Sequence, residues 1–179
     1  MNLLDEHKAA VAKIDTAVQK AFDRAKDALK CAKGCSSCCV DGLTVLPVEA
    51  ALIEASGRFP PAKSMPGMCA FLDESGACSI YEVRPVMCRT HGLALKTTEA
   101  QGPPRPGAGL GRLRVLADDV SACELNYTTR APKPDEVLDA NKLMALLVTV
   151  DRRFRAPAGI LDDASRVSLR DLAAKLRAR

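Results

Sequence analysis

The chain contains few aromatic residues and few histidines. Among its 179 residues there are no tryptophans, two tyrosines, four phenylalanines and two histidines. Proteins that hold single-stranded nucleic acid usually stack bases on aromatic side chains, so this scarcity counts against nucleic-acid binding. Two histidines leave little general-base capacity near neutral pH, and neither belongs to a metalloprotease motif or a serine-based triad. We therefore expect neither a nucleic-acid-binding protein nor a hydrolase.

Long apolar runs are also missing. No stretch approaches the roughly 18 apolar residues that cross a bilayer, and the chain begins with acidic residues where a signal peptide is basic. We expect a cytoplasmic protein without membrane contact. In that reducing compartment, eight cysteines indicate metal or redox chemistry rather than a disulfide scaffold. The tripeptide that begins at Asn126 matches a glycosylation sequon, which matters only in a secreted protein.

The net charge of +4 gives little information about partners. It counts every cysteine as a neutral thiol, and eight thiolates around two dications would lower it to zero. The basic residues near the C-terminus are expected to lie on a solvated helix face rather than to contact phosphate or an acidic partner. They are Arg152, Arg153, Arg155, Arg166, Arg170, Lys175, Arg177 and Arg179.

A long amphipathic helix is predicted over residues 3–30, because apolar positions recur every seven residues without an interrupting glycine or proline. This N-terminal unit, residues 1–30, is expected to pack on the body of the same chain, with a protein partner or a homodimer as the alternative. His7 on this helix is expected at the surface. We divide the remainder into a cysteine-cluster region at 31–125 and C-terminal helices with a basic tail at 134–179.

Turn and cap residues predict the remaining elements. The mainly α fold should combine helices with a small β-hairpin that carries cysteines on both arms. The expected elements are a helix from Pro47 to Gly57, the hairpin over 68–80, a helical turn from Pro85, a flexible Gly/Pro loop over 96–114, an edge strand at 113–116, a helix over 135–155 and a helix from Ser168.

The cysteines occur in two groups. Four crowd into nine residues, and four follow downstream; they are Cys31, Cys35, Cys38 and Cys39, then Cys69, Cys78, Cys88 and Cys123. Thiolate sulfur is the ligand that favours zinc, copper(I) and iron–sulfur clusters. We therefore predict a metal centre enclosed by the cysteine-rich loop and the hairpin.

Spacing leaves two types of metal centre open. In the first, the crowded segment and the hairpin hold one or two zinc ions, or iron. Neighbouring side chains diverge, so Cys38 and Cys39 should not both serve one mononuclear centre. In the second, the first three cysteines hold a [4Fe–4S] cluster, and the protein would be an enzyme with redox or methyltransferase-type activity.

One pattern resembles a known family. The run Cys31-x-x-x-Cys35-x-x-Cys38-Cys39, then Cys69, then Gly76-x-Cys78-x-Ile80-Tyr81-x-x-Arg84-Pro85-x-x-Cys88-Arg89, is similar to the bacterial CxxxCxxCC cysteine-cluster family of YkgJ type. The resemblance implies zinc or iron chelation by the seven cysteines through Cys88. Related sequences include a flagellin lysine methylase thought to use an iron–sulfur cluster, so an enzyme is permitted but not identified.

The chain departs from this pattern after Arg89, where Thr90-His91-Gly92 replaces the aromatic residue and proline often found there. His91 therefore becomes an additional candidate ligand. Cys123, outside the shared block, is a candidate ligand or a small buried hydrophobe. Arg84 and Arg89 are candidates to support the metal, or to pair with Glu82 or a helix end, and Tyr81 is expected in the core. The predicted function is metal binding, with an iron–sulfur enzyme or a metal-responsive adaptor as alternatives.

Overall fold

A computed structural model describes residues 2–32, 34–97, 113–117, 119–159 and 165–179. Within these residues the fold is mainly α, as the sequence predicts. Five α-helices account for most of its regular structure: α1 (Leu3–Ala25), α2 (Pro47–Ala55), α3 (Val86–Thr90), α4 (Ala140–Arg155) and α5 (Leu169–Arg177). A short 3₁₀ turn, η1 (Lys26–Ala28), continues α1, so the long N-terminal helix is confirmed. None of the described helices is long and apolar enough to span a membrane.

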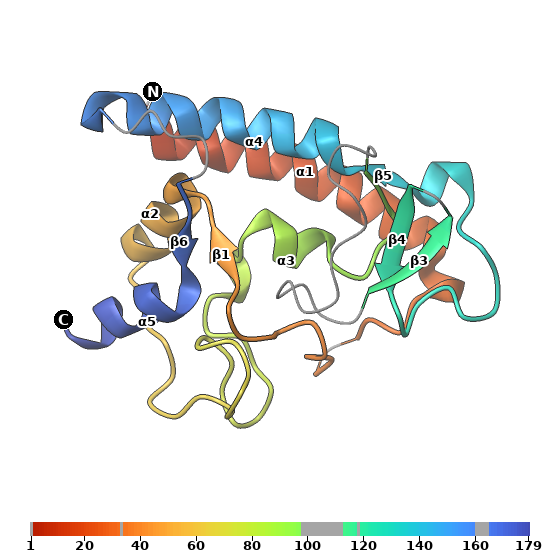
Figure 1. The fold of residues 1–179 in the computed structure, drawn as a ribbon, viewed down its shortest axis with the longest axis horizontal. Helices are drawn as coiled ribbons and strands as arrows, with labels where there is room; N and C mark the ends of the chain where they lie inside the picture. The colour runs from red at the N-terminus through yellow and green to blue at the C-terminus, as the bar shows by residue number, and fades with distance from the viewer. Residues whose placement is uncertain (1, 33, 98–112, 118, 160–164) are drawn as a thin grey trace.

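Helices α1 and α4 lie side by side and run antiparallel along the length of the molecule (Figure 1). Glu6 near the start of α1 pairs with Arg153 near the end of α4 at 2.7 Å. The apolar stripe of α1 is buried in its own chain, since α1 also contacts α2 and α3. The prediction for His7 was wrong: this residue is 1% exposed, because it faces the packed interface rather than solvent.

Two small sheets flank the helices. Strand β1 (Thr44–Val45) pairs antiparallel with β6 (Val167–Ser168) beside α2 and α5 (Figure 1). At the other end of the molecule, the sheet order is β3-β4-β2-β5. Its strands are β2 (Leu95–Lys96), β3 (Leu113–Ala117), β4 (Val120–Cys123) and β5 (Leu138–Asp139). Strand β3 lies at an edge, as predicted for residues 113–116.

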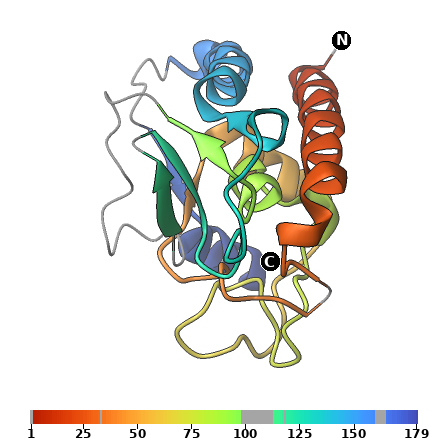
Figure 2. The same ribbon diagram turned by 90° about the vertical axis from the view of Figure 1, so that its right-hand side faces the viewer.

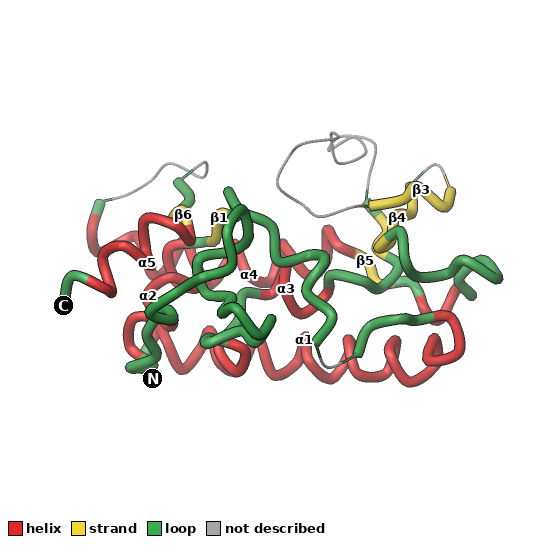
Figure 3. Tube along the Cα trace, turned by 90° about the horizontal axis from the view of Figure 1, so that it is seen from below, coloured by secondary structure: helices red, strands yellow, loops and turns green. Residues whose placement is uncertain are grey.

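The cysteine-bearing loops form a layer on the side of α3 that faces away from α1 and α4 (Figures 1 and 2). Viewed from below, these loops cross the middle of the molecule between its helical end and its sheet (Figure 3). The hairpin predicted over 68–80 is present without regular strands. Its arms are joined by the isolated bridge Leu72↔Cys78 and by backbone hydrogen bonds from Asp73 to Ala77 and from Ser79 to Phe71. The Asp73 carboxylate accepts further hydrogen bonds from the backbone amides of Ser75 and Ala77, so side-chain capping adds to the backbone pairing of the arms.

The starts of three predicted helices are confirmed. Helix α2 begins at Pro47, and α3 begins immediately after Pro85. The Ser168 side chain caps α5 by accepting a hydrogen bond from the Asp171 backbone amide. Each start is therefore determined by a proline or a capping residue, as the sequence indicates.

The helix predicted over 135–155 begins later than expected, at Ala140. Residues Pro134–Glu136 form a separate 3₁₀ turn, and Asp139 is the N-cap whose side chain accepts from the Lys142 backbone amide. Most of the Gly/Pro loop predicted over 96–114 lies outside the described residues.

Several of the basic C-terminal residues are engaged within the chain. Arg170 pairs with Asp41, and both Lys175 and Arg179 pair with Glu54. Arg166 donates to the backbone carbonyl of Thr44. These contacts join the last helix and the strand before it to α2 and to the segment around β1. For Arg155 the expectation of a solvated face was wrong, because its side chain is 3% exposed and pairs with the buried Asp151.

Candidate metal centre

The crowded cysteine segment lies directly against the segment that carries the later cysteines. The Cys69 backbone amide donates to the Cys39 carbonyl at 2.8 Å, and Val40 forms a bridge with Met68. Cys69 is buried in one apolar cluster with Phe71 and Leu72, and Cys39 and Cys78 pack against that cluster. Thiols from distant parts of the sequence therefore share one region of the fold.

Helix α3 brings Cys88 to the same region. The helix begins after Pro85, and the Cys88 amide donates to the Pro85 carbonyl at 2.9 Å. Burial raises the pKa of the Cys88 thiol, and the neighbouring thiols of Cys69 and Cys78 act in the same direction. Burial also raises the pKa of Cys78, while the Arg84 guanidinium opposes that rise. Arg84 is thus close enough to Cys78 to favour its thiolate.

Cys31 occupies the other side of the cysteine loop, next to the sheet. Its sulfur accepts a hydrogen bond from the Asn126 side-chain amide at 3.3 Å. A Cβ atom on Gly92 would lie 2.7 Å from the same sulfur, so only glycine leaves room for Cys31 there. Burial raises the pKa of the Cys31 thiol, and the Asn126 hydrogen bond opposes this effect.

Cys38 and Cys39 interact directly. A hydrogen bond with the Cys39 side chain lowers the pKa of Cys38 to about 7, and the same bond raises the pKa of Cys39. The hydrogen bond thus favours the thiolate form of Cys38 and the thiol form of Cys39. Cys35 is the exposed member of the loop, and its sulfur lies 3.8 Å from the Ser37 hydroxyl.

Cys123 lies at the end of β4 and is buried. Burial raises the pKa of its thiol, and Cys38 and Cys35 act in the same direction. Thiols that raise one another's pKa fall into two groups, and Cys38 acts on members of both groups. The first comprises Cys31, Cys35 and Cys123, and the second comprises Cys39, Cys69, Cys78 and Cys88.

All eight cysteines are free thiols, and no group of three cysteine, histidine, aspartate or glutamate side chains among the described residues is arranged closely enough to hold a metal ion. The predicted enclosure of a metal centre is therefore not shown. The donor set nevertheless fits zinc or iron in its chemistry, because thiolate sulfur is a preferred ligand of both. The seven-cysteine ligand set stays a prediction, as does the participation of Cys123.

His91 forms the C-cap of α3, three residues after Cys88. Its Nε2 atom is buried and has no hydrogen-bond partner within the described part of the chain. Burial lowers the pKa of this imidazole, which favours the neutral form that can ligate a metal. His91 accordingly stays a candidate ligand.

The Tyr81 side chain is exposed, whereas the Arg89 side chain is buried. The prediction that Tyr81 is in the core was wrong: it is 61% exposed, and the Arg84 guanidinium lies 3.9 Å from the centre of its ring. Arg89 pairs with Asp15 of α1, a partner that the sequence did not indicate, and not with the Glu82 carboxylate. Arg89 also donates to the carbonyls of Arg84 and Glu82, so its contacts fix the chain just before Cys88.

Sequence reasoning missed the two residues that lie against the Cys31 sulfur. Asn126 is notable in the sequence only as part of a sequon, yet its side chain is fully buried and cannot carry a glycan in this fold. Gly92 stands beside His91 in the sequence, but its closeness to Cys31 depends on tertiary packing. Neither position carries a local signal, because these contacts join segments that are far apart in the sequence.

Comparison with known families finds a match over the cysteine-bearing part of the chain. The family model CxxCxxCC, described as a putative zinc- or iron-chelating domain, matches residues 30–105. This segment holds every cysteine from Cys31 to Cys88, and the resemblance seen in the sequence is confirmed by the match. No curated protein and no solved structure matches the chain.

Proposed function

We propose that this protein binds zinc or iron through its cysteine cluster. The observation that carries the proposal is the hydrogen bond between the Cys69 amide and the Cys39 carbonyl, which joins the two cysteine-bearing segments of the matched domain. Around this junction the chain places several soft sulfur donors. Metal binding is the chemistry that such a donor set performs best.

The proposed ligands are drawn from Cys31, Cys35, Cys38, Cys39, Cys69, Cys78 and Cys88, with Cys123 and His91 as further candidates. The division of the thiols into two groups that meet at Cys38 supports a centre with more than one metal ion. Adjacent Cys38 and Cys39 can each serve a different tetrahedral ion, and zinc is the metal we favour over an iron–sulfur cluster.

Bound metal would also stabilise the loop layer. The core is poor in aromatic side chains, and the loops that carry the cysteines contain little regular structure to hold them. Because the ligands come from segments far apart in the sequence, the free energy of metal binding would add to the free energy of folding. Two alternatives use the same cysteines. One is an iron–sulfur enzyme, and the other is an adaptor whose affinity for a protein partner changes when metal binds.

Elemental analysis and absorption spectra of anaerobically purified protein test the proposal. We expect zinc or iron at about one or two ions per chain, without colour for zinc and with brown colour for an iron–sulfur cluster. Cys35→Ser should lower the metal content and the thermal midpoint together, whereas Ser36→Ala in the same loop should change neither. Metal-free protein whose thiols all react, and which takes up neither metal, would refute the proposal.

A further inference from the structure

Asn126 is a buried side chain whose polar atoms all meet the cysteine region. It is fully buried. Its Oδ1 accepts from the Lys30 amide at 2.7 Å, and its Nδ2 donates to the Gly92 carbonyl at 2.7 Å and to the Cys31 sulfur at 3.3 Å. The Asn126 side-chain amide therefore connects Lys30, Gly92 and the candidate ligand Cys31. Asn126 itself lies outside the matched segment at 30–105.

The turn that carries Asn126 is held in an uncommon backbone conformation. Tyr127 has a φ of 52°, the left-handed region that aromatic residues rarely adopt. Its amide donates to the Ala28 carbonyl at 2.8 Å, and the Arg114 guanidinium donates to the carbonyls of both Asn126 and Tyr127. Strained backbone persists where surrounding contacts define it, and such positions concentrate at functional sites.

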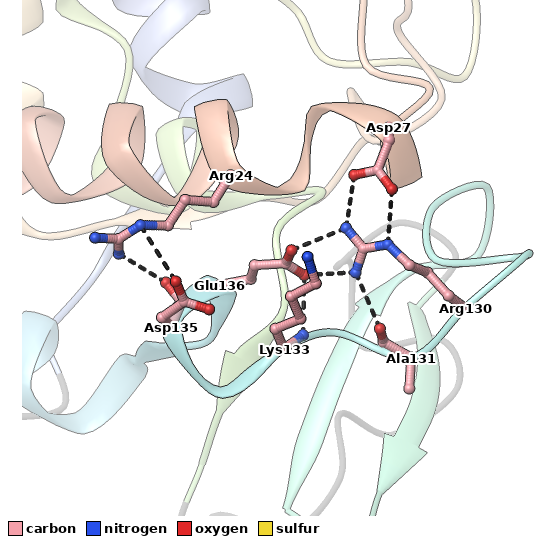
Figure 4. A network of polar contacts seen from close by, with 7 residues as sticks. All are labelled: Arg24, Asp27, Arg130, Ala131, Lys133, Asp135 and Glu136. Carbon is pink, nitrogen blue, oxygen red and sulfur yellow. Dashed lines mark hydrogen bonds and ion pairs between the residues drawn. The ribbon is translucent and has the colours of Figure 1, made fainter.

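A second set of contacts fixes the chain just after this turn. Arg130 pairs with Asp27 at 2.7 Å and with Glu136 at 2.8 Å, as Figure 4 shows. The Glu136 side chain is fully buried, and its Oε2 also accepts from the Lys133 amide. These contacts anchor the segment to the turn that follows α1, and they involve neither Asn126 nor a cysteine. A substitution that weakens these contacts is therefore a control: it should lower the stability of the fold without changing the position of the Cys31 sulfur.

We propose that Asn126 is a positioning residue of the candidate metal centre, which holds the Cys31 sulfur in the orientation of a metal ligand. The inference rests on the proposed function and extends its site beyond the matched domain. An N–H group directed at a metal-bound thiolate offsets part of its negative charge and fixes its direction. Loss of such a partner typically lowers metal affinity about 10- to 100-fold.

Asn126→Asp gives the sharpest test, because it keeps the size and the acceptor for the Lys30 amide but removes the donor to sulfur. Wild type and variant are titrated with Zn(II), Co(II) and, anaerobically, Fe(II), against a competing chelator. We expect affinity about 10- to 100-fold lower in the variant and a shifted sulfur-to-Co(II) charge-transfer band. Should the buried carboxylate prevent folding, Asn126→Ala removes the same donor without a charge.

Two comparisons distinguish a positioning role from a structural one. Asp27→Asn weakens the Arg130 anchor and should lower thermal stability while leaving affinity and the Co(II) band unchanged. In a Cys31→Ser background, Asn126→Asp should have no further effect on affinity, because the interaction it removes is already lost. Equal affinity and band in wild type and Asn126→Asp, or effects of the two substitutions that simply add, would overturn the inference while the proposed function stands. A wild-type protein that binds none of the three metals overturns both.

Discussion

Arg89 Nη1 lies 2.7 Å from Asp15 Oδ2, and this ion pair joins α3 to the middle of α1. The Arg89 side chain is only 8% exposed, whereas Asp15 is 43% exposed. The same guanidinium donates to the carbonyls of Arg84 and Glu82, so one residue connects the long helix to the turn before Cys88. The position of Cys88 therefore depends on a contact with a helix that is distant in the sequence.

Asp15→Asn should destabilise the fold by about 1–3 kcal/mol, because it removes the charged partner of a largely buried guanidinium. Urea unfolding followed by circular dichroism measures the change. The matched control is Asp5→Asn, which breaks an exposed pair with Lys8 and should cost less than about 1 kcal/mol. Equal effects of the two substitutions would show that Arg89 does not depend on Asp15.

Gly92→Ala should displace the Cys31 sulfur. Gly92 has a φ of +102°, and an added Cβ would lie 2.7 Å from that sulfur and 3.2 Å from Asn126 Nδ2. We expect a loss of about 1–3 kcal/mol in unfolding free energy and weaker Zn(II) binding in a competition titration. Gly67→Ala is the control, since Gly67 has a φ of +71° but open space around it, so backbone strain alone should cost about 1 kcal/mol. Unchanged metal affinity in Gly92→Ala would argue against Cys31 as a ligand.

Local signals predicted the helices well. Pro47 at the start of α2, the turn after Pro85 and the Ser168 cap of α5 are each determined by neighbouring residues. The hairpin over 68–80 forms with paired arms but without regular strands, because one isolated bridge, two backbone hydrogen bonds and the Asp73 carboxylate order it. The start of α4 was placed too early because the sequence does not distinguish the 3₁₀ turn at Pro134 from the first turn of a helix.

The candidate site was only partly predictable. Motif spacing identified the cysteines, but not the opposite pKa shifts of Cys38 and Cys39 or the separation of the thiols into two groups. The contacts of Asn126 and Gly92 arise from packing between distant segments, which periodicity and caps do not encode. His7 was misplaced for a similar reason: its environment is formed by α3 and α4 rather than by its own helix.

The buried His7 should make the fold sensitive to mild acid. Burial lowers its pKa below the usual 6.5, Arg89 adds to this effect and Asp151 opposes it. As the pH falls below about 6.5, the unfolded chain binds a proton that the folded chain resists, so stability is present above that pH and decreases below it. Unfolding free energies measured from about pH 7.5 to about pH 5.5 should fall less steeply in His7→Gln than in wild type, with His91 retained in both. Parallel pH profiles would exclude a contribution from His7.

Metal binding should release protons. Burial raises the pKa of the Cys31, Cys69, Cys78 and Cys88 thiols, so these groups are protonated at neutral pH and must lose protons to become ligands. Calorimetric titration with Zn(II) in buffers of different ionisation enthalpy should show more than one proton released per ion, and affinity should increase with pH. Binding without proton release would indicate ligands other than these thiols.

X-ray absorption spectroscopy of the metal-loaded protein is the decisive experiment for the cysteine cluster, because it identifies the atoms bound to the metal. We expect at least about three sulfur neighbours at about 2.3 Å from zinc, or the corresponding sulfur shell around iron. A first shell made only of nitrogen and oxygen at about 2.0–2.2 Å would show that the thiols are not the ligands.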